Sequence, residues 1–123
     1  IFRYSTSDYD YRHLIRQVRH PEKPVTAVFV DCPYQYLNLF NQFLKAGISV
    51  PDEVSLVCRQ DADFLNFVQP SPAHYTFDAD SMAKNIQSSL EARIQGDRLQ
   101  RFRKLLVPEF RNGDSLSVSP AKV

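Results

Sequence analysis

The chain has 123 residues, a net charge of +1 and 43% hydrophobic residues. This length provides one domain with a sizeable core, and the near-zero charge gives no basic field of the kind that indicates nucleic-acid binding. No apolar run reaches the length of a membrane-spanning helix, and the N-terminus lacks a signal-peptide pattern. Because the sequence opens on Ile1 without a Met, we expect a piece of a longer protein.

The first third of the chain predicts a strand, a helix and a second strand. Residues 1–4 are expected to form a short strand, which a polar turn follows. Residues 11–18 predict a helix, because apolar side chains recur there at the spacing of one helix face: Tyr11, Leu14, Ile15 and Val18. Residues 25–30 form an unbroken apolar run, which is typical of a strand buried on both faces in a parallel sheet.

A second helix is expected to begin at Pro33, whose missing N–H costs nothing in a first turn, with Asp31 or Cys32 at the cap. Its predicted buried stripe consists of Leu37, Phe40 and Leu44. Gly47 is a suitable residue to end it.

The second half predicts a buried strand at 54–58 and a long loop at 60–72 with one helical turn at 63–67. A short extended piece at 73–77 precedes a helix at 79–95, which Gly96 ends. That helix has an apolar side chain every fourth residue: Met82, Ile86, Leu90 and Ile94. Residues 101–110 are expected to be extended, and the chain to end in a mobile tail from Ser115 on.

This alternation of strands and helices predicts the α/β class, with a flavodoxin-like parallel sheet flanked by helices and joined by right-handed crossovers. In such sheets, ligands bind beyond the carboxyl ends of the strands. Those ends are Asp31-Cys32 and Arg59-Gln60-Asp61. We therefore expect Asp31, Cys32, Gln60 and Asp61 to be the ligand-contact candidates, with capping or loop hydrogen bonds as the alternative role for the acidic residues and Gln60.

Three segments carry a family resemblance. Residues 47–57, GISVPDEVSLV, resemble the "G-x-x-V-P-x-D-V-S-V-V" segment of the LacI/GalR family of bacterial transcriptional regulators. Residues 24–29, PVTAVF, resemble the family's "P-T-A-V-F" with one insertion, and residues 105–110, LLVPEF, resemble "L-L-P-P-E-L". Each segment is modest, but their order and spacing together are specific.

The resemblance implies that the chain is part of the effector-binding domain, which is like a periplasmic sugar-binding protein of type I with two subdomains. Residues 1–76 and 108–115 would belong to the C-terminal subdomain, and residues 116–123 would be a tail. Residues 77–107 would normally pack on an N-terminal subdomain that this chain lacks, as it also lacks the family's DNA-binding headpiece.

The expected ligand contacts depart from the family pattern. The family often has "N-D" after its "T-A-V-F" strand, where this chain has Cys32-Pro33. The family's "G-F-D-D" corresponds to Cys58-Arg59-Gln60-Asp61 in this chain. Relative to the family, the site thereby loses one carboxylate and one amide. An ionised carboxylate only accepts hydrogen bonds, whereas an amide both donates and accepts them. These changes weaken the expectation of a sugar and leave the small-molecule effector unidentified.

The resemblance also implies a homodimer. The helix after Pro33 and the loop after Asp61 have more apolar side chains than one buried face requires, and the family uses these elements in its dimer interface. The resulting interface candidates are Leu37, Phe40, Phe64 and Phe67. The alternative is that all four belong to the intramolecular core.

Cys32 and Cys58 have no metal-finger spacing and no disulfide framework, so they fit a reducing cytoplasm. They are either a thiol pair that senses redox state or metal, or two buried and inert side chains, which we favour. His13, His20 and His74 have no metal-ligand spacing and are interpreted as surface or loop residues. No metal, cofactor or catalytic motif is expected, and we predict that the protein is not an enzyme.

The leading hypothesis is therefore the effector-sensing and dimerisation part of a LacI-type regulator, which would contact operator DNA only through its headpiece. One alternative is the solute-binding protein of a transport system, which shares the fold but would normally follow an export signal. The other is a small flavodoxin-like thiol enzyme that uses Cys32 or Cys58.

Overall fold

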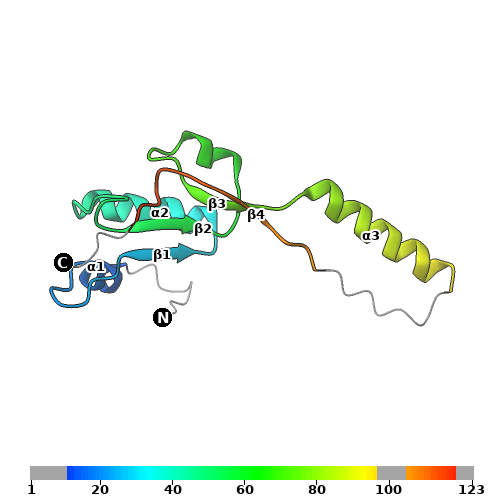
Figure 1. The fold of residues 1–123 in the computed structure, drawn as a ribbon, viewed down its shortest axis with the longest axis horizontal. Helices are drawn as coiled ribbons and strands as arrows, with labels where there is room; N and C mark the ends of the chain where they lie inside the picture. Colours follow the sequence, from blue (N-terminus) through cyan, green and yellow to red (C-terminus); the bar gives the residue numbers. More distant parts are fainter. Residues whose placement is uncertain (1–10, 97–104, 119–123) are drawn as a thin grey trace.

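The computed structural model describes residues 11–96 and 105–118, and they form an α/β fold around one four-stranded sheet (Figure 1). The elements in chain order are α1 (Arg12–Val18), β1 (Ala27–Val30), α2 (Pro33–Lys45), β2 (Ser55–Cys58), the 3₁₀ helix η1 (Asp63–Phe67), β3 (Ala73–Thr76), α3 (Ala79–Ile94) and β4 (Glu109–Arg111). The predicted strand at 1–4 and part of the extended piece at 101–110 lie outside the described residues.

The strand order is β1-β2-β3-β4, in which β1, β2 and β3 are parallel and β4 is antiparallel to β3. The predicted α/β class is confirmed, and the sheet is mixed only because β4 returns beside β3. Val30 pairs with Cys58, and Cys58 pairs with His74. These pairs bring the carboxyl ends of β1 and β2 next to the start of β3.

The burial of β1 differs from the prediction. β1 is at one edge of the described sheet, where Val30 is buried but Phe29 is 59% exposed. In β2, by contrast, Ser55, Leu56 and Cys58 are buried and only Val57 is partly exposed. An apolar run was expected to be covered on both faces, but the composition of a strand does not determine its position in the sheet.

α2 begins at Pro33 with Cys32 as its N-cap residue, and Gly47 follows it in the left-handed conformation (φ 66°). Both ends were predicted. The predicted stripe was wrong in phase, because Leu44 is 59% exposed and Leu37 is only partly buried. The side chains that α2 buries are Pro33, Tyr36, Leu39, Phe40 and Phe43.

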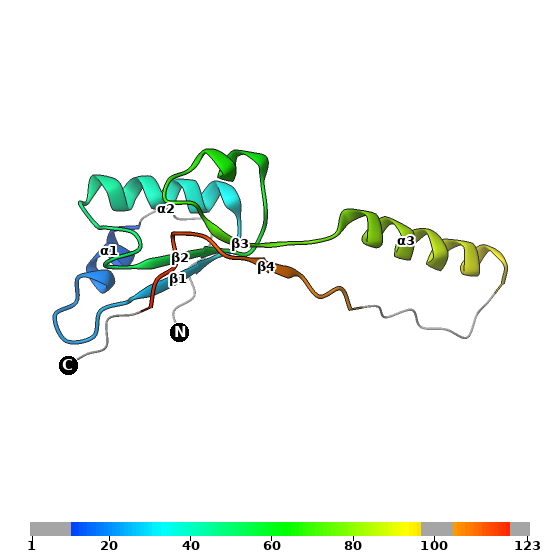
Figure 2. The same ribbon diagram turned by 45° about the horizontal axis from the view of Figure 1, so that its top comes forward.

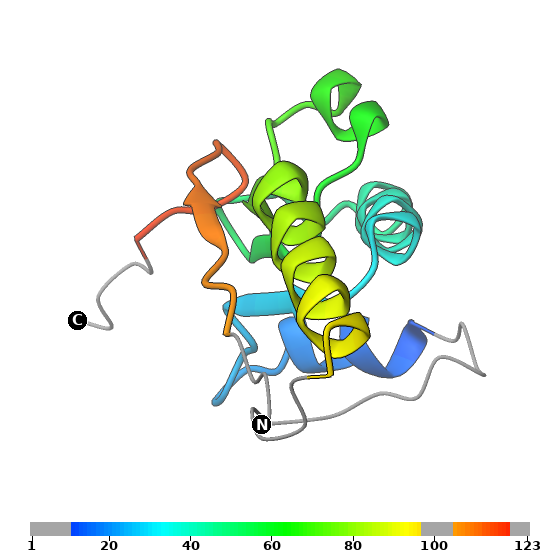
Figure 3. The same cartoon turned by 90° about the vertical axis from the view of Figure 1, so that its right-hand side faces the viewer.

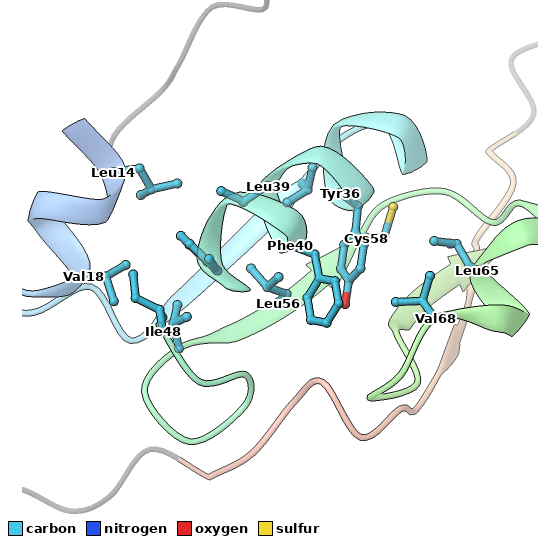
Figure 4. Close-up of a cluster of buried hydrophobic side chains, with 13 residues drawn as sticks. Leu14, Val18, Tyr36, Leu39, Phe40, Ile48, Leu56, Cys58, Leu65 and Val68 are labelled. Atoms are coloured by element: carbon cyan, nitrogen blue, oxygen red, sulfur yellow. The ribbon is translucent and has the colours of Figure 1, made fainter. Parts of the chain in front are cut away.

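One core joins α1 and α2 to β2 and to the segment around η1 (Figure 4). Leu56 and Phe43 are completely buried at its centre. Tyr36 is also completely buried, and its hydroxyl makes no hydrogen bond to any described residue. Burial is the main reason that the pKa of Tyr36 lies above its ordinary value, although the nearby Ser115 hydroxyl acts in the opposite direction.

α3 stands apart from this core and extends beyond the sheet on the side of the strand ends of β1 and β2 (Figures 1 and 2). In the view turned by 90°, α3 lies in front of the sheet (Figure 3). Asp78 caps it by accepting hydrogen bonds from the N–H groups of Asp80 and Ser81, and Gly96 follows it with φ 88°. None of the residues of α3 is buried.

The predicted mobile tail is wrong at its start. Ser115 is completely buried, and its backbone N–H donates to Ser71 O at 3.0 Å. Ser117 continues the contact, since its N–H donates to Ser55 Oγ at 3.1 Å. The chain after β4 is therefore held against β2 at least as far as Ser117.

Candidate functional site

Two pairs of charged or titratable side chains lie where β1 and β2 end, and we refer to Asp31, Arg59, Asp61 and His74 as the strand-end cluster. Asp31 directly follows β1, and Arg59 directly follows β2. The N–H of Arg59 donates to Val30 O at 2.7 Å, which continues the pairing of the two strands past their ends. His74 enters from β3, where it pairs with Cys58.

The strand-end cluster contains one ion pair and one histidine–carboxylate contact. The first joins the Nε of Arg59 to a carboxylate oxygen of Asp31, with side chains that are 49% and 66% exposed. The second joins the Nε2 of His74 to Asp61 at 3.4 Å. Because the Nδ1 of His74 lies 2.8 Å from Pro72 O, which can only accept, Nδ1 holds a proton.

The two thiols lie beside this cluster in different surroundings. Cys58 is completely buried, and burial is the main reason that its pKa is raised above the ordinary value, although the N–H of Gln60 partly opposes the shift. Cys32 is half-buried at the N-terminus of α2. A buried thiol with a raised pKa is a poor nucleophile, which supports the structural interpretation of Cys58.

The structure brings together the predicted contact residues but adds two that sequence analysis did not select. Asp31 and Asp61 are exposed, and Cys32 and Gln60 are half-buried, all at the strand ends. Arg59 was expected at the end of the strand but was not selected as a ligand contact. His74 was interpreted as a surface or loop residue, yet its side chain is only 16% exposed. Its position next to the end of β2 depends on strand pairing, for which one sequence gives no direct signal.

The predicted dimer residues lie in three different environments. Phe40 is 6% exposed and belongs to the core of this chain, as the alternative interpretation expected. Leu37 and Phe64 are partly buried against that core, and the ring of Phe64 lies 5.2 Å from the ring of Tyr34. Phe67 is 87% exposed at the end of η1. Phe67 is thus the candidate with the most surface to offer a partner.

Within residues 11–96 and 105–118, His, Cys, Asp and Glu side chains form no group of three or more that could hold a metal ion. None of the helices described is long and apolar enough to cross a membrane.

Comparison with known proteins identifies a family and a set of relatives. Residues 3–116 match the family model described as a periplasmic binding protein-like domain. The chain is 27% identical over 104 residues to a probable opine utilization operon repressor of Rhizobium rhizogenes, over 81% of this chain and 52% of that protein. It thus spans about half the length of this curated relative.

Solved structures show the same fold at low identity. A LacI family regulator from Enterococcus faecium with bound ribose has a TM-score of 0.66 and 19% identity, over 91% of this chain and 41% of that one. A putative LacI family repressor from Corynebacterium glutamicum has a TM-score of 0.69 and 18% identity, over 86% and 41%. The regulator CelR in complex with cellobiose has a TM-score of 0.67 and 20% identity, over 88% and 34%.

The expected family resemblance is therefore confirmed, as is the expectation of a partial effector domain. The chain belongs to the periplasmic binding protein-like domain family.

Proposed function

We propose that this chain is the effector-sensing and dimerisation part of a LacI-type transcriptional regulator, which binds operator DNA through a headpiece elsewhere in the protein. The observation that supports this most is the relative placement of the strand-end cluster and α3. Asp31 and Arg59 directly follow the carboxyl ends of β1 and β2, and α3 extends beyond the sheet on the side of those ends (Figure 1). A second subdomain packed on α3 would enclose that edge and create a ligand site between the two halves.

The exposed apolar face of α3 is evidence for a second subdomain. Ile86 and Leu90 are 55% and 57% exposed, Met82 is 38% exposed, and Ile94 is 84% exposed. These four side chains, spaced every four residues, form the α3 stripe. An apolar stripe of this kind on a long helix indicates an interface. We propose that residues 77–107 pack on the other subdomain, whereas residues 1–76 and 108–115 form the subdomain seen here.

We further propose that Asp31, Cys32, Gln60 and Asp61 contact the effector. They lie where ligands of parallel α/β sheets bind, and three of them have side chains that accept hydrogen bonds. Closure of the two subdomains on the effector would change the arrangement of the dimer and so the affinity for DNA. Such a coupling between two sites is what allosteric regulation requires.

We propose a homodimer whose interface includes Phe67, Phe64 and Leu37. Phe67→Glu places a charge on the most exposed of these side chains and should shift the complete protein toward monomer in light scattering. Asn66→Glu is the matched control, because residue 66 is also exposed in η1. A variant at Phe67 that remains as dimeric as the control would disprove this interface.

We do not propose catalytic activity. The relatives are named as transcriptional regulators rather than enzymes, and the buried Cys58 thiol is unsuited to nucleophilic attack. Regulation of transcription would place the protein in the cytoplasm, where the operator DNA is.

The test is a gel-mobility-shift experiment with the complete protein on DNA from the region upstream of its own gene. The regulator hypothesis predicts sequence-specific binding by the complete protein and none by residues 1–123 alone at physiological salt, because these residues have a net charge of only +1. Absence of specific binding by the complete protein, or a footprint made by residues 1–123, would contradict it.

A further inference from the structure

The charges of the strand-end cluster alternate in sign across the sheet. Asp31 follows β1, Arg59 and Asp61 follow β2, and His74 comes from β3. Since β1, β2 and β3 are neighbours in that order, the edge presents an anion, a cation and a second anion, with the His74 imidazole beside the second anion. One small ligand can therefore meet both signs of charge there.

Arg59 has donors to spare at this edge. A guanidinium carries five N–H donors in a rigid fork that matches a carboxylate with two parallel hydrogen bonds. Asp31 contacts only the Nε of Arg59, and the two Nη groups make no hydrogen bond to any residue between 11–96 or 105–118. The Arg59 side chain is also 49% exposed. It can thus keep Asp31 and still receive a carboxylate from a ligand.

The acidic side chains offer the complementary contact. Asp61 is 50% exposed and touches His74 through a single carboxylate oxygen, and Asp31 is 66% exposed. An ionised carboxylate only accepts hydrogen bonds. An ammonium group, which only donates, is therefore its natural partner.

Removal of the strand-end cluster from water determines which class of ligand suits it. When a second subdomain covers the edge, Arg59 and Asp61 lose water, and a charge that is removed from water is costly unless it is paired. A neutral polyol supplies hydroxyl groups but no charge. A zwitterion supplies one charge of each sign, so that each ionic side chain gains a charge-assisted partner and the net charge of the site is unchanged.

We propose that the effector of this protein is a small zwitterion of the amino-acid type, with its carboxylate on Arg59 and its ammonium on Asp61 and Asp31. The inference deepens the proposed function and rests on it. The family motif has an Asp at the position of Gln60. Because Gln60 is neutral, one negative charge fewer lies near the positive charge of Arg59.

The experiment is isothermal titration calorimetry of the complete protein with two sets of probes. The zwitterions, each with one carboxylate and one ammonium group, are L-glutamine, L-alanine and L-leucine, and the neutral probes are ribose and cellobiose. At least one zwitterion is expected to bind, and its methyl ester, which lacks the carboxylate charge, should bind at least about tenfold more weakly. Binding of a neutral sugar with none of the zwitterions, or of no probe at all, would overturn the proposal.

Variants locate the binding at this cluster. Arg59→Gln and Asp61→Asn should each weaken the zwitterion by about tenfold or more, and Arg59→Lys should lose less than Arg59→Gln because it retains the charge. Arg16→Gln removes an exposed cation on α1, away from the strand ends, and should leave the affinity unchanged. Circular dichroism confirms that each variant is folded. Equal affinity in Arg59→Gln and Arg16→Gln would place the ligand elsewhere.

The same protein samples separate this inference from the proposed function. Specific binding of the complete protein to its upstream DNA, together with a sugar effector, would refute the zwitterion and retain the regulator. Loss of both DNA binding and ligand binding in a folded protein would refute both.

Discussion

Leu56 and Ser115 are joined by two hydrogen bonds across 59 residues of sequence. The N–H of Leu56 donates to Ser115 O at 2.9 Å, and the Ser115 hydroxyl donates to Leu56 O at 2.7 Å. The same hydroxyl accepts from the N–H of Ala73 at 2.8 Å. One buried serine therefore links the chain after β4 to both β2 and β3, the strands next to the strand-end cluster.

Ser115→Ala is expected to destabilise the chain by about 1–3 kcal/mol, because it leaves the buried N–H of Ala73 without its partner. Urea unfolding followed by circular dichroism measures this change. Ser88→Ala, at an exposed position of α3, should alter the free energy of unfolding by no more than about 0.5 kcal/mol. Equal effects of the two substitutions would show that the buried hydroxyl contributes nothing.

Gly113→Ala is expected to be more harmful than Gly96→Ala. A Cβ at Gly113 would lie 2.5 Å from backbone atoms of Ser71, Pro72 and Ala73, so the backbone would have to move, at a cost of about 1–3 kcal/mol or more. Gly96 has open space around it and only its positive φ to oppose a side chain, at a cost of about 1 kcal/mol. Thermal unfolding of the two variants compares these costs, and a smaller loss at Gly113 would contradict the close approach of the two segments.

Alkaline pH should weaken the fold through Cys58. Its pKa is raised from 9.0 by burial, so the unfolded chain loses this proton at lower pH than the folded chain does. The contribution to stability is fully present below the unfolded pKa and is lost as the pH rises through the folded pKa. Urea unfolding between about pH 7 and pH 10 should show this decline, and Cys58→Val should reduce it.

Cys32→Ser is the control for this pH dependence, because Cys32 is only half-buried. Tyr36, whose pKa is raised from 10.0, adds a further decline of the same sign at higher pH. If the free energy of unfolding of Cys58→Val declines with pH as steeply as that of the wild type, a group other than Cys58 causes the decline at pH values below those at which Tyr36 titrates.

The α3 stripe gives a test of the proposed second subdomain. In residues 1–123 alone, Ile86→Glu should change the free energy of unfolding by no more than about 0.5 kcal/mol, because Ile86 is 55% exposed. In the complete protein it should cost about 1.5–3 kcal/mol, the value of a buried isoleucine side chain. Lys84→Glu, an exposed position outside the stripe, should be mild in both. A mild effect of Ile86→Glu in the complete protein would mean that nothing covers α3.

The elements that could be predicted from the sequence are those whose signals are local. Residues 79–94 form a helix because an apolar residue every fourth position, Asp78 at the start and Gly96 at the end all agree. The helical turn at 63–67 and the start of α2 at Pro33 were predicted for the same kind of reason. The phase of α2 was not, because Tyr36 and Phe43 also fit a helix face and only the packed core distinguishes them from Leu44.

Features that depend on distant partners could not be predicted. The polar composition after residue 114 indicated a mobile tail. In the structure, β3 begins at Ala73, which pairs with Val57, so β3 does not reach the preceding residue Leu56. The N–H of Leu56 instead donates to Ser115 O. Asp31 and Asp61 were selected correctly as strand-end residues because neighbouring parallel strands end at one edge. His74 reached the same edge through the register of β3 against β2, which no short pattern of residues specifies.

Regulation by an effector is tested by the affinity of the complete protein for its upstream DNA, measured with and without the effector found by calorimetry. A regulator of this design predicts a change in DNA affinity of at least about fivefold, and the same change in effector affinity when DNA is present. An effector that binds the wild-type protein but leaves its DNA affinity unaltered would contradict the account.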